Sequence, residues 1–319
     1  MPDDRQHPIE SPFDARSTAA EVAAAANLKG RTVVVTGGYS GIGLETTRAL
    51  EAAGARVIVT VRSPEKAQDA LSRLTVETVT LDLSEPESIE TGARTLRDLT
   101  ADGIDILINN AGIMATPLRR NSKGWESQFA TNHLGHFALF ARLSDLLLKR
   151  EGARVVALSS IAHRRCGVDL EDWNFHTGEY EKWNAYARSK TANALFALEL
   201  NTRYEPQGLK AYSVHPGGIA TDLQRDLDME EMRAMGWFDE NDQPHPMFKT
   251  PQQGASTTLW AATSPFLEDR GGVYCEDCNI ADPNPPEGAF TGVLPHARDP
   301  QAAQKLWALS EEITGLKAV

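Results

Sequence analysis

A tyrosine and a lysine offer the first candidate chemistry in this sequence. Tyr186 and Lys190 stand four positions apart in a stretch that predicts a helix, so their side chains share one face. A free tyrosine, with a pKa near ~10, is a weak acid, and a nearby ammonium lowers that pKa by favouring the phenolate. The pair therefore fits proton transfer to a carbonyl oxygen. Without further motifs, a solvated helix face that carries both residues is the simpler interpretation.

A glycine-rich turn is the second candidate. The run T-G-G-Y-S-G-I-G at 36–43 directly follows a β-branched stretch that predicts a buried strand, and a helical pattern comes next. Glycines in such a place allow a tight turn and close approach of a pyrophosphate, and the helix start offers free N–H groups. The strand–turn–helix context favours dinucleotide binding over a purely structural turn.

The spacing T-G-x-x-x-G-x-G resembles the short-chain dehydrogenase/reductase family. Three more motifs follow in that family's order: N-N-A-G at 109–112, Y-x-x-x-K at 186–190 and P-G-x-x-x-T at 216–221. Within the family the sequence is most similar to the retinol-dehydrogenase-like and protochlorophyllide-reductase-like branch. The S-S-I-A-H run at 159–163, the T-N-H-L-G-H-F run at 131–137 and a long gap before Tyr186 carry this likeness.

The resemblance implies roles for single residues. Tyr186 is the general acid/base, and Lys190 lowers its pKa and holds the nicotinamide ribose. Ser160 polarises the substrate oxygen, although it precedes Tyr186 by 26 positions where the family usually has 13, so Ser159 is an alternative. Asn132 matches a helix asparagine thought to hold a water between the lysine and solvent.

The end of the second predicted strand bears on the cofactor. Val61 stands where relatives that prefer NAD carry an acid, and Arg62 can pair with a 2′-phosphate, which favours NADP(H) over NAD(H). The alternative is that Arg62 is an ordinary surface residue and that the protein uses both NADP(H) and NAD(H). Asp82 and Leu83 resemble a pair that contacts adenine, though Asp82 could simply cap a turn. The predicted cofactor-binding residues are Gly37, Tyr39, Ser40, Gly41, Ile42, Gly43, Arg62, Asp82, Leu83, Asn110, Ala111, Gly112, Tyr186, Lys190, Pro216, Gly217, Ile219 and Thr221.

The implied activity is hydride transfer that interconverts a carbonyl and an alcohol, with a small-molecule substrate. A catalytically silent NADP-binding sensor or docking protein is the alternative, but such a protein is expected to lack the Tyr, Lys or Ser. An epimerase or dehydratase of the extended branch usually shows T-G-x-x-G-x-x-G, which is absent. The family also usually forms dimers or tetramers, so a homodimer or homotetramer is expected.

The elements that must position these residues alternate along the chain. Strands are predicted at 32–35, 56–60, 76–81, 104–108, 155–158 and 210–214, and helices at 42–53, 63–74, 84–99, 125–149 and 184–203. Such βαβ repetition predicts one Rossmann-type, doubly wound α/β domain at 28–319, with about seven mainly parallel strands and helices on both faces. A leader at 1–27 precedes it, weakly ordered to residue 16 and then helical, with Glu21 placed for a capping box.

Two stretches interrupt the alternation. Residues 161–183 form an insertion, and residues 223–250, rich in Met and aromatic residues, are expected to form a substrate lid. Both follow strands, on the side where ligands bind in such sheets, and the lid composition favours an apolar substrate. The Met and aromatic positions could instead be ordinary helix core.

The composition argues against several classes of protein. The 319 residues carry 44 acids against 32 bases, a net charge of −12, which argues against nucleic acid and against polybasic docking on lipid. No run of 18 apolar residues and no signal pattern occurs. Three cysteines are too few for a disulfide framework, which favours the cytoplasm. Cys275 and Cys278 are most simply structural, and no metal site is predicted, His133 and His136 included.

Overall fold

The computed structural model describes residues 5–319. Within them lies one eight-stranded sheet of order β3-β2-β1-β4-β5-β6-β7-β8, parallel except for the β7–β8 pair. This confirms the predicted doubly wound α/β fold, with one strand more than expected because the chain turns back after β7. The strands are β1 Thr32–Thr36, β2 Arg56–Val61, β3 Glu77–Thr80, β4 Ile106–Asn109, β5 Arg154–Leu158, β6 Lys210–His215, β7 Tyr274–Glu276 and β8 Asn279–Ile280.

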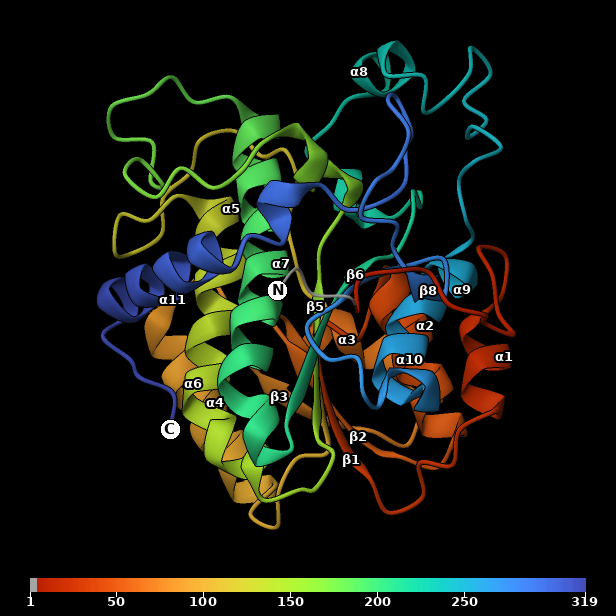
Figure 1. The fold of residues 1–319 in the computed structure, drawn as a ribbon, viewed down its shortest axis with the longest axis vertical. Coiled ribbons are helices and arrows are strands. Elements are labelled where there is room, and N and C mark those ends of the chain that lie inside the picture. The colour runs from red at the N-terminus through yellow and green to blue at the C-terminus, as the bar shows by residue number, and fades with distance from the viewer. Residues whose placement is uncertain (1–4) are drawn as a thin grey trace.

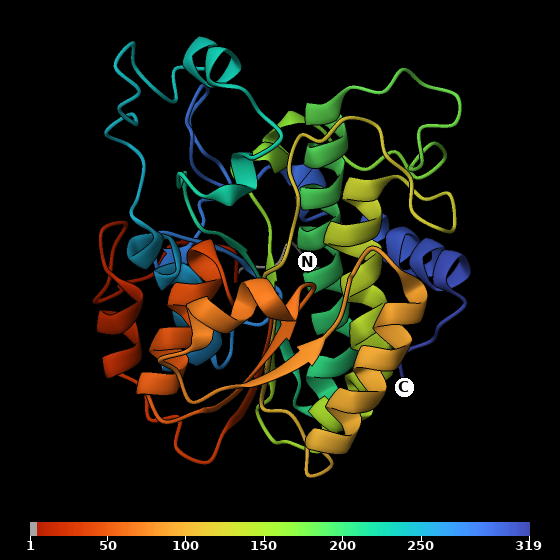
Figure 2. The same ribbon diagram turned by 180° about the vertical axis from the view of Figure 1, so that it is seen from behind.

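Helices cover both faces of the sheet (Figures 1 and 2). One layer holds α1, α2, α3 and α10, the other holds α4, α6 and α7, and α11 packs on the outer side of α7. The α-helices are α1 Ala19–Ala24, α2 Gly41–Ala52, α3 Pro64–Leu71, α4 Pro86–Leu99, α5 Ser127–Phe129, α6 Gly135–Leu148, α7 Lys182–Tyr204, α8 Met229–Ala234, α9 Pro251–Gly254, α10 Ser256–Thr263 and α11 Pro300–Thr314.

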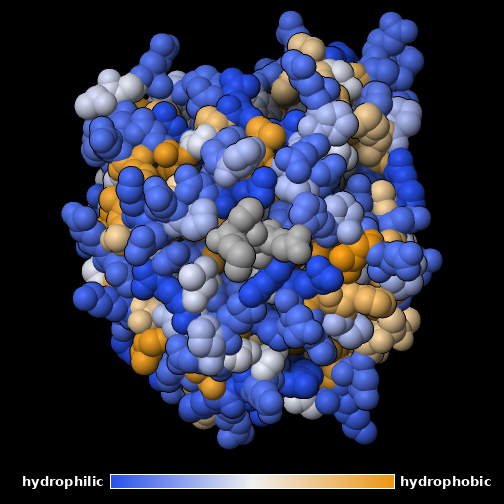
Figure 3. All heavy atoms as spheres, viewed as in Figure 1, coloured by the Kyte–Doolittle hydropathy of each residue, from blue (hydrophilic) through white to orange (hydrophobic). Residues whose placement is uncertain are grey.

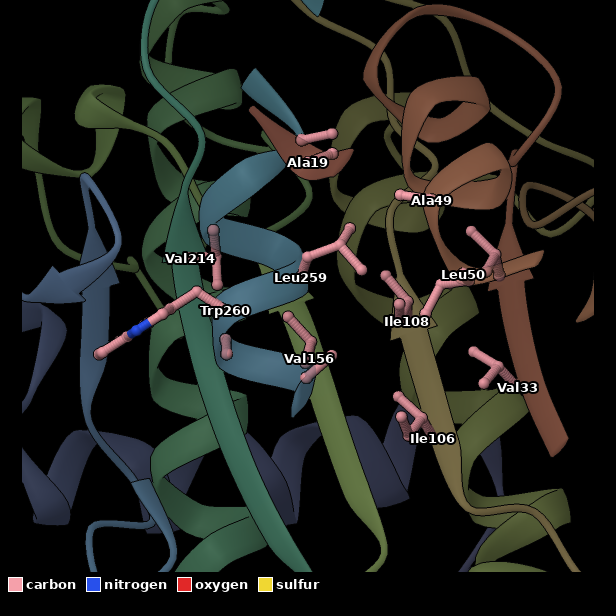
Figure 4. Packing of buried hydrophobic residues seen from close by; sticks show 14 of the residues in the cluster. Ala19, Val33, Ala49, Leu50, Ile106, Ile108, Val156, Val214, Leu259 and Trp260 are labelled. Carbon is pink, nitrogen blue, oxygen red and sulfur yellow. The ribbon is translucent and has the colours of Figure 1, made fainter. Parts of the chain in front are cut away.

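The strands are buried on both faces, as a parallel sheet between two helical layers requires. Along β1, Val33 and Val35 join the core under α1, α2 and α10, while Val34 joins the core under α4 and α6. Figure 4 shows Leu259 and Trp260 of α10 beside strand side chains of the first core. The alternation of a β-strand thus divides one apolar run between two cores.

The order of the strands places the candidate site. β1 and β4 are neighbours, yet the chain proceeds from β1 towards β2 on one side and from β4 towards β5 on the other. Ligands of open α/β sheets bind in the crevice that such a reversal leaves beyond the strand ends. The glycine turn follows β1 and the N-N-A-G run follows β4, so both lie at this crevice.

The leader is more firmly placed than predicted. Thr18 and Glu21 form the expected capping box on α1. Residues 5–16, however, are not weakly ordered: the buried Gln6 side chain accepts a hydrogen bond from Tyr274 N (2.8 Å) and donates to Tyr274 O (3.0 Å). Ile9 and Asn279 exchange two further bonds. These contacts lie 268 or more positions away, beyond the reach of local patterns. Residues 1–4 of the predicted leader lie outside the described residues.

The face seen in Figure 3 is mainly hydrophilic, with hydrophobic residues in separate patches. Across residues 5–319 we find no helix with the length and apolar character needed to cross a membrane. In the same residues no group of three or more His, Cys, Asp or Glu side chains could hold a metal ion. Cys166, Cys275 and Cys278 are free thiols.

Candidate active site

A cleft of about 530 Å³ lies at the crevice. All the predicted cofactor-binding residues line it, as do Ser160, Tyr186 and Lys190. Asn132 does not line it, whereas its neighbour Thr131 does. Sequence analysis did not assign the lining residues Ile113, Met114 and Phe290, whereas Gln224, Arg225 and His245 belong to the predicted 223–250 lid.

The glycine turn packs closely against the N-N-A-G run. Gly37 has φ +63°, and a Cβ at Gly43 would lie 2.5 Å from Asn110 Nδ2 and 2.6 Å from Gly37 O, so a larger residue is excluded at position 43. The following helix α2 starts at Ser40 without a side-chain cap and has no acid in its first turn. Its free N–H groups and positive dipole end are therefore open to an anion. The buried Asn110 Oδ1 also has no partner, but as an acceptor it can receive only an O–H or N–H donor and not a phosphate oxygen.

Tyr186 and Lys190 lie on α7 as predicted, but their environment alters the expected electrostatics. Tyr186 is 4% exposed, and burial raises the pKa of its phenol to about 12, against the opposing effect of the Ser160 side chain. Burial therefore dominates the pKa of this phenol in the cofactor-free protein, and the predicted influence of Lys190 on it stays a prediction. Burial also lowers the pKa of Lys190 to about 8. Its Nζ donates to Leu158 O (3.0 Å) and lies 5.6 Å from the centre of the Tyr186 ring.

The two adjacent serines have different partners. Ser159 is buried and donates its hydroxyl to Lys190 O (2.8 Å). The Ser160 side chain lies next to the Tyr186 phenol and acts to lower its pKa, and its oxygen accepts from Ala162 N (3.2 Å). The hydroxyl that meets the tyrosine is thus that of Ser160, while Ser159 ties β5 to α7.

Asn132 stands behind the cleft and braces it. Its Nδ2 donates to Ile113 O and to Ser189 Oγ, both at 2.9 Å, and its Oδ1 accepts from Ile113 N at 2.9 Å. It lies in a π-helical turn, Ala130–Leu134, that interrupts the single helix predicted over 125–149. Such turns frequently mark functional sites. Asn132 thereby fixes both the loop after β4 and the start of the lysine's helical turn.

A histidine that sequence analysis left unassigned joins three site segments. His136 Nδ1 contacts the carbonyl of Asn132 (2.9 Å), so this nitrogen carries the proton. Burial lowers the pKa of His136 to about 4, so the ring is neutral and Nε2 accepts from the Thr36 hydroxyl (2.9 Å). Thr36 Oγ1 in turn accepts from the backbone N–H groups of Asn110 (2.9 Å) and Ala111 (3.0 Å). The ends of β1 and β4 are thus locked to the π-helical turn.

A second histidine, His163, holds the backbone of Ser160 in place. His163 Nε2 accepts from Leu294 N (3.3 Å), and burial lowers the pKa of His163 to about 4. The proton of the neutral ring therefore sits on Nδ1, which donates to Ser160 O (2.7 Å). The Tyr274 hydroxyl donates to the same carbonyl (3.1 Å). The backbone of Ser160 is thereby fixed to β7 and to the loop before α11.

The adenosine end of the cleft carries Arg62 and Asp82. Arg62 is exposed at the end of β2, and no ion pair of its guanidinium occurs with the part of the chain that the structure describes. Asp82 Oδ1 accepts from Ser84 N (2.9 Å) and Ser84 Oγ (2.7 Å), so it does cap a turn while also lining the cleft.

The two irregular stretches extend at the same end of the molecule (Figures 1 and 2), but only one of them lines the cleft extensively. From residues 161–183 only Ile161 does so. Part of that stretch packs against the segment before α5, where Arg120 donates to Asn174 O (2.9 Å) and Tyr180 to Thr116 O (2.9 Å). Residues 223–250 contribute Leu223, Gln224, Arg225, Met235, Gly236, Trp237, His245, Met247 and Phe248.

The 223–250 segment is fastened at both ends. Glu231 on α8 accepts from Lys182 Nζ (2.5 Å) and Trp183 Nε1 (3.0 Å), both at the start of α7. At the other end Lys249 pairs with Asp277 (2.6 Å), and its N–H donates to Gly218 O (2.8 Å). Its apolar side chains form one cluster with the Tyr186 ring.

A glycine turn at the strand-order reversal, sharing one cleft with a Ser, a Tyr and a Lys, defines a dinucleotide-binding α/β oxidoreductase. The family model described as short chain dehydrogenase matches residues 31–232. The chain belongs to the short-chain dehydrogenase/reductase family, whose members bind a nicotinamide cofactor.

Similar proteins span nearly the whole chain. The short-chain dehydrogenase/reductase prx1 of Penicillium roqueforti is 41% identical over 318 residues, covering 96% of this chain and 92% of the relative. Human retinol dehydrogenase 12 is 35% identical over 297 residues, covering 91% and 88%. The relatives thus include the retinol-dehydrogenase-like branch. The crystal structure of an uncharacterised protein from Mycobacterium paratuberculosis superposes with a TM-score of 0.72 at 36% identity, covering 95% and 99%.

Proposed function

We propose that this protein is an NADP(H)-dependent oxidoreductase that interconverts a carbonyl compound, aldehyde or ketone, and its alcohol. The observation that carries the proposal is the meeting of Ser160, Tyr186 and Lys190 in the cleft that begins at the glycine turn. The free start of α2 and the partnerless Asn110 Oδ1 fit a dinucleotide there. When bound, the nicotinamide supplies or accepts the hydride.

The side chains divide the remaining work. The Tyr186 phenol, kept protonated by its raised pKa of about 12, donates a proton to the carbonyl oxygen during reduction. The Ser160 hydroxyl, next to Tyr186, donates a hydrogen bond to the same oxygen and stabilises its developing charge. Lys190, whose pKa of about 8 leaves it largely charged at pH 7, holds the ribose hydroxyls and favours the phenolate left after transfer. Asn132 positions the α7 turn that carries Lys190.

The preference for NADP(H) rests on Arg62. The exposed guanidinium at the end of β2 is free to pair with a 2′-phosphate, and Val61 provides no acid to bind the ribose hydroxyls of NAD(H). Arg62→Asp is expected to move the ratio of kcat/KM for NADPH and NADH towards NADH by about 100-fold. An unchanged ratio would show that Arg62 does not select the cofactor.

The substrate is proposed to be apolar, because Met114, Met235, Trp237 and Phe248 line the cleft beside Tyr186. The 223–250 segment is proposed as the lid that excludes water from it. The three free thiols, two of them buried, support a reducing compartment, and we propose the cytoplasm.

The test is an NADPH-oxidation screen over aliphatic, aromatic, steroid and isoprenoid carbonyls, with Tyr186→Phe as the matched variant. Wild type is expected to oxidise NADPH with apolar carbonyls, and the variant to lose about 1000-fold or more in kcat while it binds NADPH as tightly. Comparable turnover by the variant would refute the mechanism. NADPH binding without turnover of any carbonyl would instead support a silent sensor.

A further inference from the structure

Arg225 lines the cleft, yet the proposed reaction gives it no role. It stands four positions after Thr221 and closes the short 3-10 turn Asp222–Gln224. A Cβ at Gly41 would lie only 3.4 Å from the Thr221 side chain. The turn that precedes Arg225 therefore begins beside the start of α2.

The charge of Arg225 is only weakly neutralised by the protein. Its Nε lies 3.9 Å from Asp226 Oδ2, whereas Arg119 approaches the other oxygen of Asp226 to 2.9 Å. Nη1 of Arg225 donates to Asp222 O (3.0 Å), which holds the guanidinium over the turn. With 44% of its side chain exposed, the remaining donors are open to a ligand.

The cations along the cleft are spread over its length. Among the described lining residues Arg62 directly follows β2, Lys190 is buried on α7, and Arg225 follows the turn that begins beside α2. The glycine turn and the start of α2 take the two central phosphates of a dinucleotide. A planar guanidinium on the wall of the cleft matches the same phosphates, because it can offer two parallel N–H groups to an anion.

We propose that Arg225 binds the central pyrophosphate of the cofactor from the end of the turn that begins beside α2. This inference rests on the proposed function, since it adds a residue to the same cofactor site. Arg225 also lies at the base of the 223–250 segment, whose other attachments are those of Glu231 and Lys249.

The experiment measures binding of NADPH and of NADH to the substrate-free protein by quenching of tryptophan fluorescence, for wild type, R225Q and R225K. Loss of charge-assisted hydrogen bonds to phosphate is expected to raise the Kd of R225Q about 10- to 100-fold for both dinucleotides alike. R225K, which keeps a point charge, is expected to recover part of the affinity. The matched control is R233Q, because Arg233 lies on α8, pairs with Asp242 (2.5 Å) and does not line the cleft. Its Kd values are expected to equal those of wild type.

Each other result has a distinct meaning. Weaker binding of NADPH alone would assign Arg225 to the 2′-phosphate and overturn the inference. Unchanged Kd values, with or without a raised KM for substrate, would overturn it as well. Wild type that binds neither dinucleotide would refute the proposed function itself, whereas tight binding by both wild type and R225Q would refute only the role of Arg225. R225K is judged in the same way if R225Q does not fold.

Discussion

Lys190→Met is expected to stabilise the protein while it removes activity. Lys190 is 4% exposed, and burial lowers its pKa from 10.5 to about 8. At 1.36 kcal/mol for each tenfold change, keeping this lysine charged in the fold costs about 3 kcal/mol below pH 8. The substitution also removes the hydrogen bond to Leu158 O, worth about 1 kcal/mol, but that carbonyl still accepts from Asn193 Nδ2 (2.9 Å). A net gain of about 2 kcal/mol in the free energy of unfolding is expected at pH 7.

The expected gain in the free energy of unfolding of Lys190→Met depends on pH. A lysine whose folded pKa lies below its unfolded value of about 10.4 destabilises the fold fully below pH 8, less between pH 8 and 10.4, and not at all above. The stability of wild type should therefore rise towards that of Lys190→Met as the pH increases from 8 to 10. The measurement is equilibrium urea unfolding of the cofactor-free proteins at pH 7, 8.5 and 10. At pH 7 the melting temperature should also rise by about 3 °C.

The control is Lys66→Met, which removes the same charge from an exposed position on α3. It should change the free energy of unfolding by less than about 0.5 kcal/mol at every pH. The reasoning fails if Lys190→Met is no more stable than wild type at pH 7, or if its advantage is the same at pH 7 and pH 10. Either result would mean that burial does not perturb the lysine as its surroundings indicate.

Four further substitutions test other parts of the structure. Gly43→Ala should destabilise the fold by about 2–3 kcal/mol in urea unfolding and weaken NADPH binding more than 10-fold, because the alanine Cβ would lie 2.5 Å from Asn110 Nδ2 and 2.6 Å from Gly37 O. An NADPH affinity close to that of wild type would contradict the close packing of this turn. His163→Phe, which removes the donor to Ser160 O, should lower kcat about 10-fold in steady-state kinetics with the Kd for NADPH unchanged, and Tyr274→Phe should lower it less; an equal loss of NADPH affinity would indicate general disruption instead. Glu276→Gln should stabilise the fold by about 2 kcal/mol at pH 8 but not at pH 4.5, because burial raises the pKa of Glu276 from 4.5 to about 7 and makes its charged form costly in the fold. Urea unfolding at both pH values checks this, and an equal gain in stability at pH 4.5 would argue against it.

The sequence predicted best what local patterns determine. The buried strand before the glycine turn, the capping box of Thr18 and Glu21, and the shared helix face of Tyr186 and Lys190 all follow from neighbours within a few positions. Nearly all the candidate residues that these patterns and the family motifs predicted line one cleft.

The features that were missed depend on residues far apart in the chain. The π-helical turn around Asn132 has no compositional signature, because the surrounding residues favour any helix equally well. The pKa of Tyr186 depends on how deeply the finished fold buries it. The insertion turns away from the cleft because Arg120 and Thr116 hold it, contacts that span more than 50 positions. Arg225 belongs to none of the family motifs, and only its position on the cleft wall marks it as a candidate binding residue.

The docking of the amino-terminal segment on the last strands sets the order in which this chain can finish folding. Gln6 is separated by 268 positions from Tyr274, the partner that fixes it. At about 5–20 residues per second, a ribosome needs roughly 13–54 s to synthesise the intervening chain. Throughout that time residues 5–16 have no β7–β8 hairpin to bind, and the far edge of the sheet has yet to form. Closure of that edge therefore joins residues 5–16 to strands that are synthesised long after them.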